Sequence, residues 1–278
     1  MFTTLRVYHQ SLDRTLTNWQ GHCDRLHNSI QTFGWQQPNW KRLRQGAELL
    51  MSSFPVLRIT IFPDRREWIT GRSLPPNLTK DQNYGIEAIA LSGEQRCLPA
   101  HKTGNYLGAW LARNTAIQMS ASEAILVDEN GNWLETSTGN LWGWQDNSWW
   151  TPPLEAGILP GVARSQLINW LNTHNCQVKQ EAWTPDLVRK MEAIAYTNSV
   201  VEVVPIHTVR DAIYHVCTQR GGRDAINHVC TQRGGRDAIN HVCTEWQVEK
   251  EKTNKLSYDP YHPAFKLLKG LFAEESDR

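Results

Sequence analysis

"EAILVDENGNWLETSTGNLWGWQDNSWW", residues 123–150, is the stretch that decides what kind of fold this chain adopts. Apolar and polar residues alternate on both sides of Asn130-Gly131, and the pattern is repeated around Asp146-Asn147. Asn-Gly between two alternating segments is a strong hairpin signal, because the central residues of such a turn take positive φ. We therefore expect an antiparallel meander of three or four strands and an α+β fold, not a doubly wound parallel sheet.

The segments before this stretch predict a small domain of their own. Helical periodicity covers 18–34, where Gly34 ends the pattern, and a second helix is expected within 39–54. Strands are expected near 2–7, 54–62 and 66–70 from their alternation and β-branched residues. Two adjacent prolines then mark a polar connection. These observations predict a small domain over 1–72, a linker over 73–80 and a larger domain over 81–278.

The segments on either side of the hairpins extend the larger domain. A strand is expected near 84–91, a loop followed by a helix over 157–174, and a helix, strand, polar break and strand over 184–209. Residues 210–248 contain three similar 13-residue units, of which the first two differ only at Tyr214 and Asn227. Thirteen residues match no known solenoid repeat, so we interpret the units as a tandem duplication that enlarges a loop.

Composition narrows the functional classes. Lys and Arg total 29 against 28 Asp and Glu, with no basic block, which argues against nucleic-acid binding. No apolar run is long enough to span a membrane, and the first residues lack the apolar core of a secretory signal. None of the six cysteines forms a C-x-x-C pair, so we expect free thiols and a cytoplasmic location.

Lys102 is the first candidate for chemistry. It lies in "CLPAHKTGNY", which has no carboxylate that would keep its amine protonated, directly before a helical pattern. A lysine nucleophile must be partly neutral, which requires burial or a nearby cation. A surface lysine at a strand end is the alternative.

Other candidates are an acid, an anion site and a group of hydroxyl and amide donors. Glu135 follows a hairpin and could keep a pyridine nitrogen protonated, or it is an exposed glutamate. Gly161 precedes a helix, so the N–H groups of Val162 and Ala163 could bind phosphate; a plain Pro-Gly turn is the alternative. The last group is Thr197, Asn198 and Ser199.

Four motifs in a fixed order resemble those of the class IV aminotransferase family. They are H-x-x-R-L-x-x-S from His22, K-x-x-x-Y-L from Lys102, L-E-T-S-T-G-N-L-W from Leu134 and G-I-L-P-G-V-A-R from Gly157. The resemblance covers residues 1 to about 209 and a tail near 261–272. It implies a fold-type IV enzyme, with a small N-terminal α/β domain and a larger domain built on a mixed, barrel-like sheet. It also implies pyridoxal 5'-phosphate (PLP) as the cofactor, a small-molecule substrate and a homodimer.

The same resemblance assigns roles to individual residues. Lys102 would bond the cofactor and act as general base, Arg25 would contact its phosphate, and Tyr106 would lie near its phenolic oxygen. Glu135 would contact the ring nitrogen, and the turn at Gly161, Val162 and Ala163 would hold the phosphate.

Within the family, "FTTLRV" and "TNS" at 197–199 resemble 4-amino-4-deoxychorismate lyases more than other members. A transaminase acting on branched-chain or D-amino acids is the alternative, and an inactive PLP-binding member is another. A non-catalytic zinc protein is a further alternative, through the pairs His215/Cys217, His228/Cys230 and His241/Cys243. Family members usually have about 25 more residues before "FTTLRV", so we expect the chain to lack their first strand.

Overall fold

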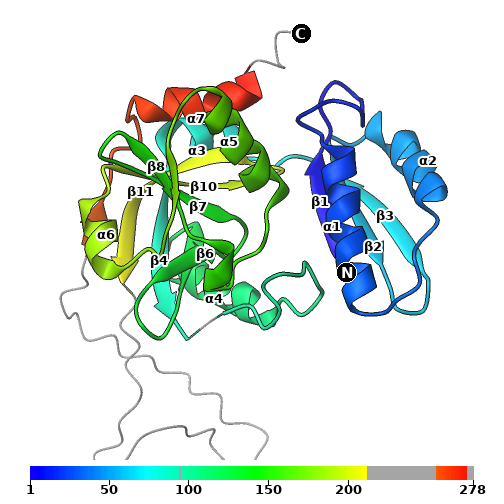
Figure 1. The fold of residues 1–278 in the computed structure, drawn as a ribbon, viewed down its shortest axis with the longest axis horizontal. Coiled ribbons are helices and arrows are strands. Elements are labelled where there is room, and N and C mark those ends of the chain that lie inside the picture. The colour runs from blue at the N-terminus through cyan, green and yellow to red at the C-terminus, as the bar shows by residue number, and fades with distance from the viewer. Residues whose placement is uncertain (94, 212–254, 274–278) are drawn as a thin grey trace, which may run out of the picture.

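The computed structural model describes residues 1–93, 95–211 and 255–273, which form a small and a large sheet with their helices (Figure 1). The small sheet is antiparallel, in the order β1-β2-β3, and consists of β1 (Phe2–Arg6), β2 (Val56–Ile61) and β3 (Glu67–Arg72). Helices α1 (Trp19–Thr32) and α2 (Trp40–Met51) cover one of its faces. The described chain therefore has the α+β architecture that the sequence predicts.

The amphipathic pattern of α1 fixes how the small unit packs. Leu26 and Ile30, one turn apart, pack with Leu57 and Ile59 of β2 in a single apolar core. The side chain of Asn18 caps α1 by accepting a hydrogen bond from Gly21 N at 3.0 Å.

The large sheet is mixed and curled, and its main path runs β6-β5-β4-β11-β10-β7-β8-β9. Its strands are β4 (Ile86–Ser92), β5 (Glu123–Val127), β6 (Trp133–Thr136), β7 (Asn140–Gln145), β8 (Ser148–Thr151), β9 (Val178–Gln180), β10 (Ala193–Asn198) and β11 (Glu202–Asp211), and β12 (Lys255–Ser257) pairs with β11. The helices around it are α3 (Leu78–Tyr84), α4 (Leu107–Gln118), α5 (Val162–Thr173), α6 (Pro185–Lys190) and α7 (Ala264–Ala273). Leu154–Ala156 form a short 3₁₀ turn.

Both predicted hairpins are present, but they do not join into a meander. β5 pairs with β6 and β7 pairs with β8, whereas the other neighbour of β7 is β10. The chain passes from β6 to β7 through a tight turn in which Thr136 N donates to Gly139 O at 2.8 Å. The meander was wrong because local alternation identifies a strand and its hairpin partner but not the distant strand on its other edge.

Two further expectations can be compared with the described residues. The small sheet ends at Arg72 and α3 begins at Leu78, so the last positions of the expected linker are helical. Most of the 13-residue units, including all three His/Cys pairs, lie outside the described residues. No helix in the described part of the chain is long and apolar enough to cross a membrane.

Candidate active site

A cavity of about 1020 Å³ lies between the small sheet and the large sheet. Successive side chains of a strand point to opposite faces, so β2 contributes to both the core and this cavity. Leu57 and Ile59 are buried against the helices, whereas Arg58 and Thr60 line the cavity together with Phe2 of β1. Residues of the large sheet and its loops form the opposite wall, and the cavity therefore depends on both units.

Lys102 lines this cavity from the loop between β4 and α4. Its carbonyl oxygen accepts a 2.9 Å hydrogen bond from Phe2 N, and its Nζ lies 5.1 Å from the centroid of the Phe2 ring. Burial lowers the pKa of Lys102 well below its ordinary value, and the nearby Arg25 and Arg96 lower it further. The amine is thus held toward the neutral form that a nucleophile or base requires.

Glu135 lines the cavity from β6 and is 1% exposed. Its Oε1 accepts hydrogen bonds from Arg96 Nε at 2.7 Å and from Leu159 N at 3.3 Å. Burial raises the pKa of Glu135, and the adjacent guanidinium of Arg96 opposes that shift. The ion pair with Arg96 therefore offsets part of the cost of burying the Glu135 carboxylate beside the cavity.

Sequence reasoning missed Arg96, which lies six residues before Lys102. Its Nη2 donates to Ser137 O at 3.0 Å, and its Cζ lies 5.3 Å from the centroid of the Tyr106 ring. An arginine in a polar loop is usually solvated, so nothing local distinguished it. The one available signal was that a buried glutamate on a strand needs a cation.

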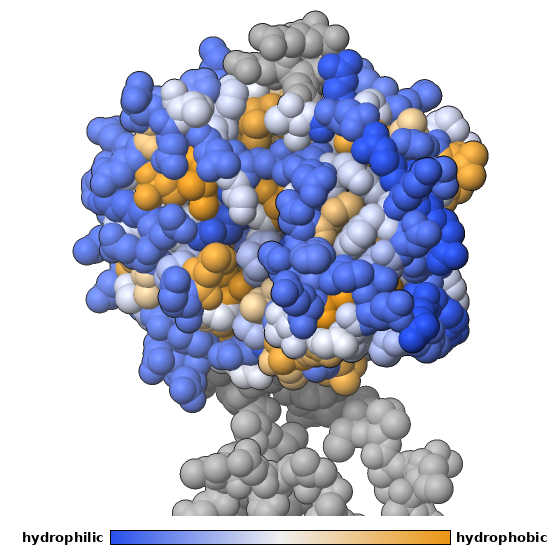
Figure 2. Space-filling view, turned by 45° about the vertical axis from the view of Figure 1, so that its right-hand side comes forward, coloured by the Kyte–Doolittle hydropathy of each residue, from blue (hydrophilic) through white to orange (hydrophobic). Residues whose placement is uncertain are grey.

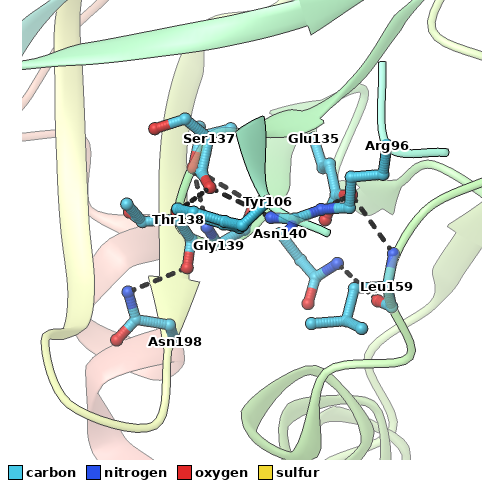
Figure 3. A network of polar contacts seen from close by, with 10 residues as sticks. Arg96, Tyr106, Glu135, Ser137, Thr138, Gly139, Asn140, Leu159 and Asn198 are labelled. Carbon is cyan, nitrogen blue, oxygen red and sulfur yellow. Dashed lines mark hydrogen bonds and ion pairs between the residues drawn. The ribbon is translucent and has the colours of Figure 1, made fainter. Parts of the chain in front are cut away.

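The turn of residues 137–139 is the meeting point of several site residues (Figure 3). Tyr106, the residue before α4, donates its hydroxyl hydrogen to Ser137 O at 2.7 Å. Asn198 at the end of β10 donates from Nδ2 to Thr138 O at 3.2 Å. One short turn therefore fixes side chains that come from distant parts of the chain.

The anion site predicted at the start of α5 also opens on the cavity. Gly161, Val162 and Ala163 line it, and no side chain caps the first N–H groups of this helix. These groups have no partner within the helix, and they lie at the positive end of its dipole, which favours an anion such as phosphate. A Cβ on Gly161 would lie 2.0 Å from Asn140 Oδ1, so this position requires glycine.

Arg25 reaches the same cavity from α1. Its Nη2 donates to Thr3 Oγ1 at 2.8 Å, and that hydroxyl lies 2.6 Å from His22 Nδ1. His22 is fully buried, and burial lowers its pKa well below the ordinary value, so the neutral ring can accept the Thr3 proton. Burial together with the charge of Arg96 lowers the pKa of Arg25 to about 10.

The three residues predicted as a donor group separate in the structure. Asn198 and Ser199 line the cavity, but Thr197 does not. Thr197 lies on the opposite face of β10, where its Oγ1 accepts a 3.1 Å hydrogen bond from Trp142 Nε1. Its position thus gives it a packing role rather than contact with a ligand in the cavity.

Unsatisfied polar atoms indicate what the cavity can hold. Among the described residues, Glu135 Oε2, Arg25 Nε and His22 Nε2 are buried without a hydrogen-bond partner. A buried polar atom without a hydrogen-bond partner destabilises the fold unless a ligand or a water molecule supplies that partner. A pyridine nitrogen would suit Glu135, a phosphate would suit Arg25 and the start of α5, and an aldehyde would suit Lys102. The residues present therefore fit PLP.

Cations outnumber carboxylates around the cavity. Asp81 and Glu135 are the carboxylates among the described lining residues, against Lys102 and five arginines: Arg25, Arg58, Arg72, Arg96 and Arg113. Arg72 is close enough to Arg58 and Arg113 to be repelled by both, because their charges add to the burial that lowers the pKa of Arg72. The cavity therefore favours an anionic ligand. Within 1–93, 95–211 and 255–273, no group of three His, Cys, Asp or Glu could hold a metal ion.

A buried lysine, a buried acid and an uncapped helix N-terminus lie around one cavity whose residues fit PLP. Residues 1–209 match the family model described as amino-transferase class IV, so the chain belongs to this family, whose cofactor is PLP. The family match confirms the resemblance read from the four motifs.

Individual relatives match this chain at low sequence identity and over only part of its length. The chain is 26% identical over 131 residues to the branched-chain-amino-acid aminotransferase of Escherichia coli K12, which covers 45% of this chain and 42% of the relative. It spans about half the length, or less, of the curated relatives it matches first.

Solved structures confirm the fold. A hypothetical aminotransferase from Mycobacterium tuberculosis in its PLP-bound form superposes with a TM-score of 0.66 at 20% identity, over 75% of this chain and 80% of that one. A Legionella pneumophila protein provisionally named 4-amino-4-deoxychorismate lyase superposes with a TM-score of 0.62 at 21% identity, over 75% and 82% of the two chains.

Proposed function

We propose that this protein is a PLP-dependent lyase that converts 4-amino-4-deoxychorismate into 4-aminobenzoate and pyruvate, a step of folate biosynthesis. The observation that carries the proposal is the cluster of Arg58, Arg72 and Arg113 in the cavity, beyond the groups suited to PLP. The proposed substrate carries two carboxylates, which such a cluster can bind in pairs. A branched-chain amino acid carries a single carboxylate, so fewer of these cations would be paired while it is bound.

The chain's residues divide the chemistry as follows. PLP, when bound, supplies an electron sink next to the substrate carbon that bears the amine. Lys102 Nζ would remove the proton from that carbon, because its lowered pKa favours the neutral amine that a base requires. Glu135 would hold a proton at the ring nitrogen, and Arg25 would bind the phosphate together with the N–H groups of Val162 and Ala163. Tyr106, fixed through Ser137 O, would orient the phenolic edge of the ring.

A pyruvate assay tests the proposal. The PLP-loaded protein should release pyruvate from 4-amino-4-deoxychorismate with no keto acid added, measured by coupling to lactate dehydrogenase. A matched reaction supplies L-leucine or D-alanine with 2-oxoglutarate. Turnover that requires the keto acid would identify a transaminase instead, and absence of turnover with all three substrates would identify a PLP-binding protein without activity.

We also propose that the protein is a homodimer whose interface includes α4. Leu107, Trp110, Leu111 and Ile117 on this helix are exposed, whereas Ala109, Ala112 and Ala116 form its buried side. Ile117 also lines the cavity, so a second copy seated on α4 would lie at the cavity's edge. Figure 2 shows that apolar side chains gather in separate patches on one face of the molecule.

Light scattering after size exclusion should give a dimer mass, and Trp110→Glu should shift the protein to monomer.

A cytoplasmic location completes the proposal. Cys23, Cys97 and Cys176 are free thiols, which is the ordinary state of cysteine in a reducing compartment.

A further inference from the structure

Glu123, at the start of β5, is a buried acid to which neither the motifs nor the proposed reaction assigns a role. It is 1% exposed and does not line the cavity. Its carboxylate accepts hydrogen bonds from the hydroxyl groups of Ser137 and Thr138. Burying a carboxylate costs free energy even when it is hydrogen-bonded, so an acid that serves only to fill the core is a poor choice at this position.

The two residues that Glu123 holds are those whose carbonyl groups organise the site. Ser137 O accepts hydrogen bonds from Tyr106 Oη and from Arg96 Nη2, and Thr138 O accepts one from Asn198 Nδ2. Figure 3 shows these side chains converging on the turn of residues 137–139 from separate segments. Through Arg96, the turn also determines where the guanidinium meets Glu135 Oε1.

The hydroxyl groups fix the orientation of the turn. A peptide carbonyl in a turn can rotate with its peptide plane unless neighbouring groups hold it. Gly139 lets this turn approach β10 closely, because a Cβ added at this position would lie 2.3 Å from Thr197 O. Glu123 anchors the side chains of Ser137 and Thr138 behind the turn, while Ser137 N donates to Ala124 O at 2.8 Å. Their carbonyl oxygens are then held toward Tyr106, Arg96 and Asn198, which line the cavity.

We infer that Glu123 is a positioning residue: by anchoring the Ser137 and Thr138 hydroxyls, it orients the carbonyls that hold Tyr106, Arg96 and Asn198 around the cofactor. The inference rests on PLP binding and not on the lyase reaction, so it stands whichever substrate is turned over. Glu123 itself touches neither the cofactor nor the substrate.

The experiment titrates the full-length protein with PLP and follows the visible absorbance of the bound cofactor as a function of pH. Glu123→Leu leaves both hydroxyl groups without their acceptor, so PLP should bind about tenfold more weakly, with a shifted pH midpoint of the absorbance. Glu123→Gln should stay within about threefold of wild type, since its amide can accept from one hydroxyl and donate to the other. Near-wild-type binding by Glu123→Gln would show that the hydrogen bonds to the two hydroxyl groups matter, and not the negative charge of Glu123.

Two further variants separate positioning from general stability. Leu43→Ala removes a buried side chain from the small core and should lower the melting temperature while leaving the PLP midpoint unchanged. Ser137→Ala should weaken PLP binding in the wild-type background but add nothing in the Glu123→Leu background, because both changes break the same contact. Wild-type PLP affinity and pH midpoint in Glu123→Leu would overturn the inference. If Glu123→Leu does not fold, wild-type values in both Ser137→Ala and Thr138→Val would overturn it.

Discussion

Lys102 shows how one side chain links reactivity to stability. Burial and three neighbouring guanidinium groups lower its pKa, which prepares the amine for chemistry but disfavours the proton that it carries in water. The folded state therefore loses free energy in order to keep this group, and that loss should depend on pH.

Lys102→Met should make the cofactor-free protein more stable at pH 7. Between the lowered pKa and the ordinary lysine value of about 10.4, the unfolded chain binds more protons than the folded one. Wild-type stability therefore rises with pH across that range. The advantage of the variant should shrink toward zero near pH ~10, as measured by urea unfolding at several pH values.

Lys190→Met, on the exposed side of α6, is the control and should leave the wild-type dependence on pH unchanged. Parallel curves for wild type and Lys102→Met would contradict the burial of the Lys102 amine.

Thr3 contributes to the site through the hydrogen bond that its hydroxyl oxygen accepts from Arg25. Thr3→Val removes the oxygen that accepts from Arg25 Nη2 and faces His22 Nδ1. Loss of one such hydrogen bond should weaken PLP binding about fivefold to tenfold. Pyridoxal, which lacks the phosphate, should bind the variant and the wild type equally. An equal loss for both ligands would show that Thr3 acts on the ring end of the site instead.

At this scale the sequence predicted the types of residue but not all of their partners. Lys102, Glu135 and Arg25 could be found because each stands in an ordered motif. Arg96 and Glu123 could not, since each acts through a contact with a residue more than ten positions away. Thr197 was grouped with Asn198 by adjacency in sequence, although adjacent residues of a strand face opposite ways.

At the scale of elements, the start of α5 is the feature most sensitive to a small change. Gly161→Ala would place a methyl group against Asn140, whose Nδ2 donates to Leu159 O at 2.9 Å. We expect PLP affinity to fall by about tenfold or more as the turn moves, since misplaced donors lose most of their value. Isothermal titration with PLP and with inorganic phosphate measures the effect.

Gly104→Ala provides the matched control, because Gly104 also lines the cavity but a Cβ there would meet nothing within 4 Å. Equal affinities for the two alanine variants would show that the turn does not hold the phosphate.

Most elements were predictable because their signals are local. The turn signals at Asn130-Gly131 and Asp146-Asn147, helical periodicity and Gly34 were sufficient to place the hairpins and helices within a few residues. The order of strands was not, because β4 lies between β5 and β11, and β11 follows it by more than a hundred residues. That pairing depends on the whole sheet and leaves no local pattern.

For the whole molecule, Glu202 holds the small sheet against the large one. Its carboxylate accepts hydrogen bonds from Arg6 Nη1 at 2.6 Å, Tyr8 Oη at 2.8 Å and Gln82 Nε2 at 3.0 Å. Arg6 belongs to β1 and Gln82 to α3, so one side chain joins both walls of the cavity.

Glu202→Ala should lower the free energy of unfolding by about 1–3 kcal/mol and also weaken PLP binding. The second effect is expected because Arg25 and the start of α5, which we propose bind the phosphate, line the cavity from opposite units. Glu67→Ala, which removes the partner of Arg42 within the small unit, should lower stability without changing PLP affinity. Equal PLP affinities in the two variants would argue against this role of Glu202.

The pairing of β11 with β12 has a consequence for how the gene can change. Arg210 and Lys255 are direct partners across these antiparallel strands, so the described residues on either side of 212–254 are held at neighbouring positions of the sheet. Replication slippage that gains or deletes a 13-residue copy would alter the protein's mass but not the spacing of these anchor points.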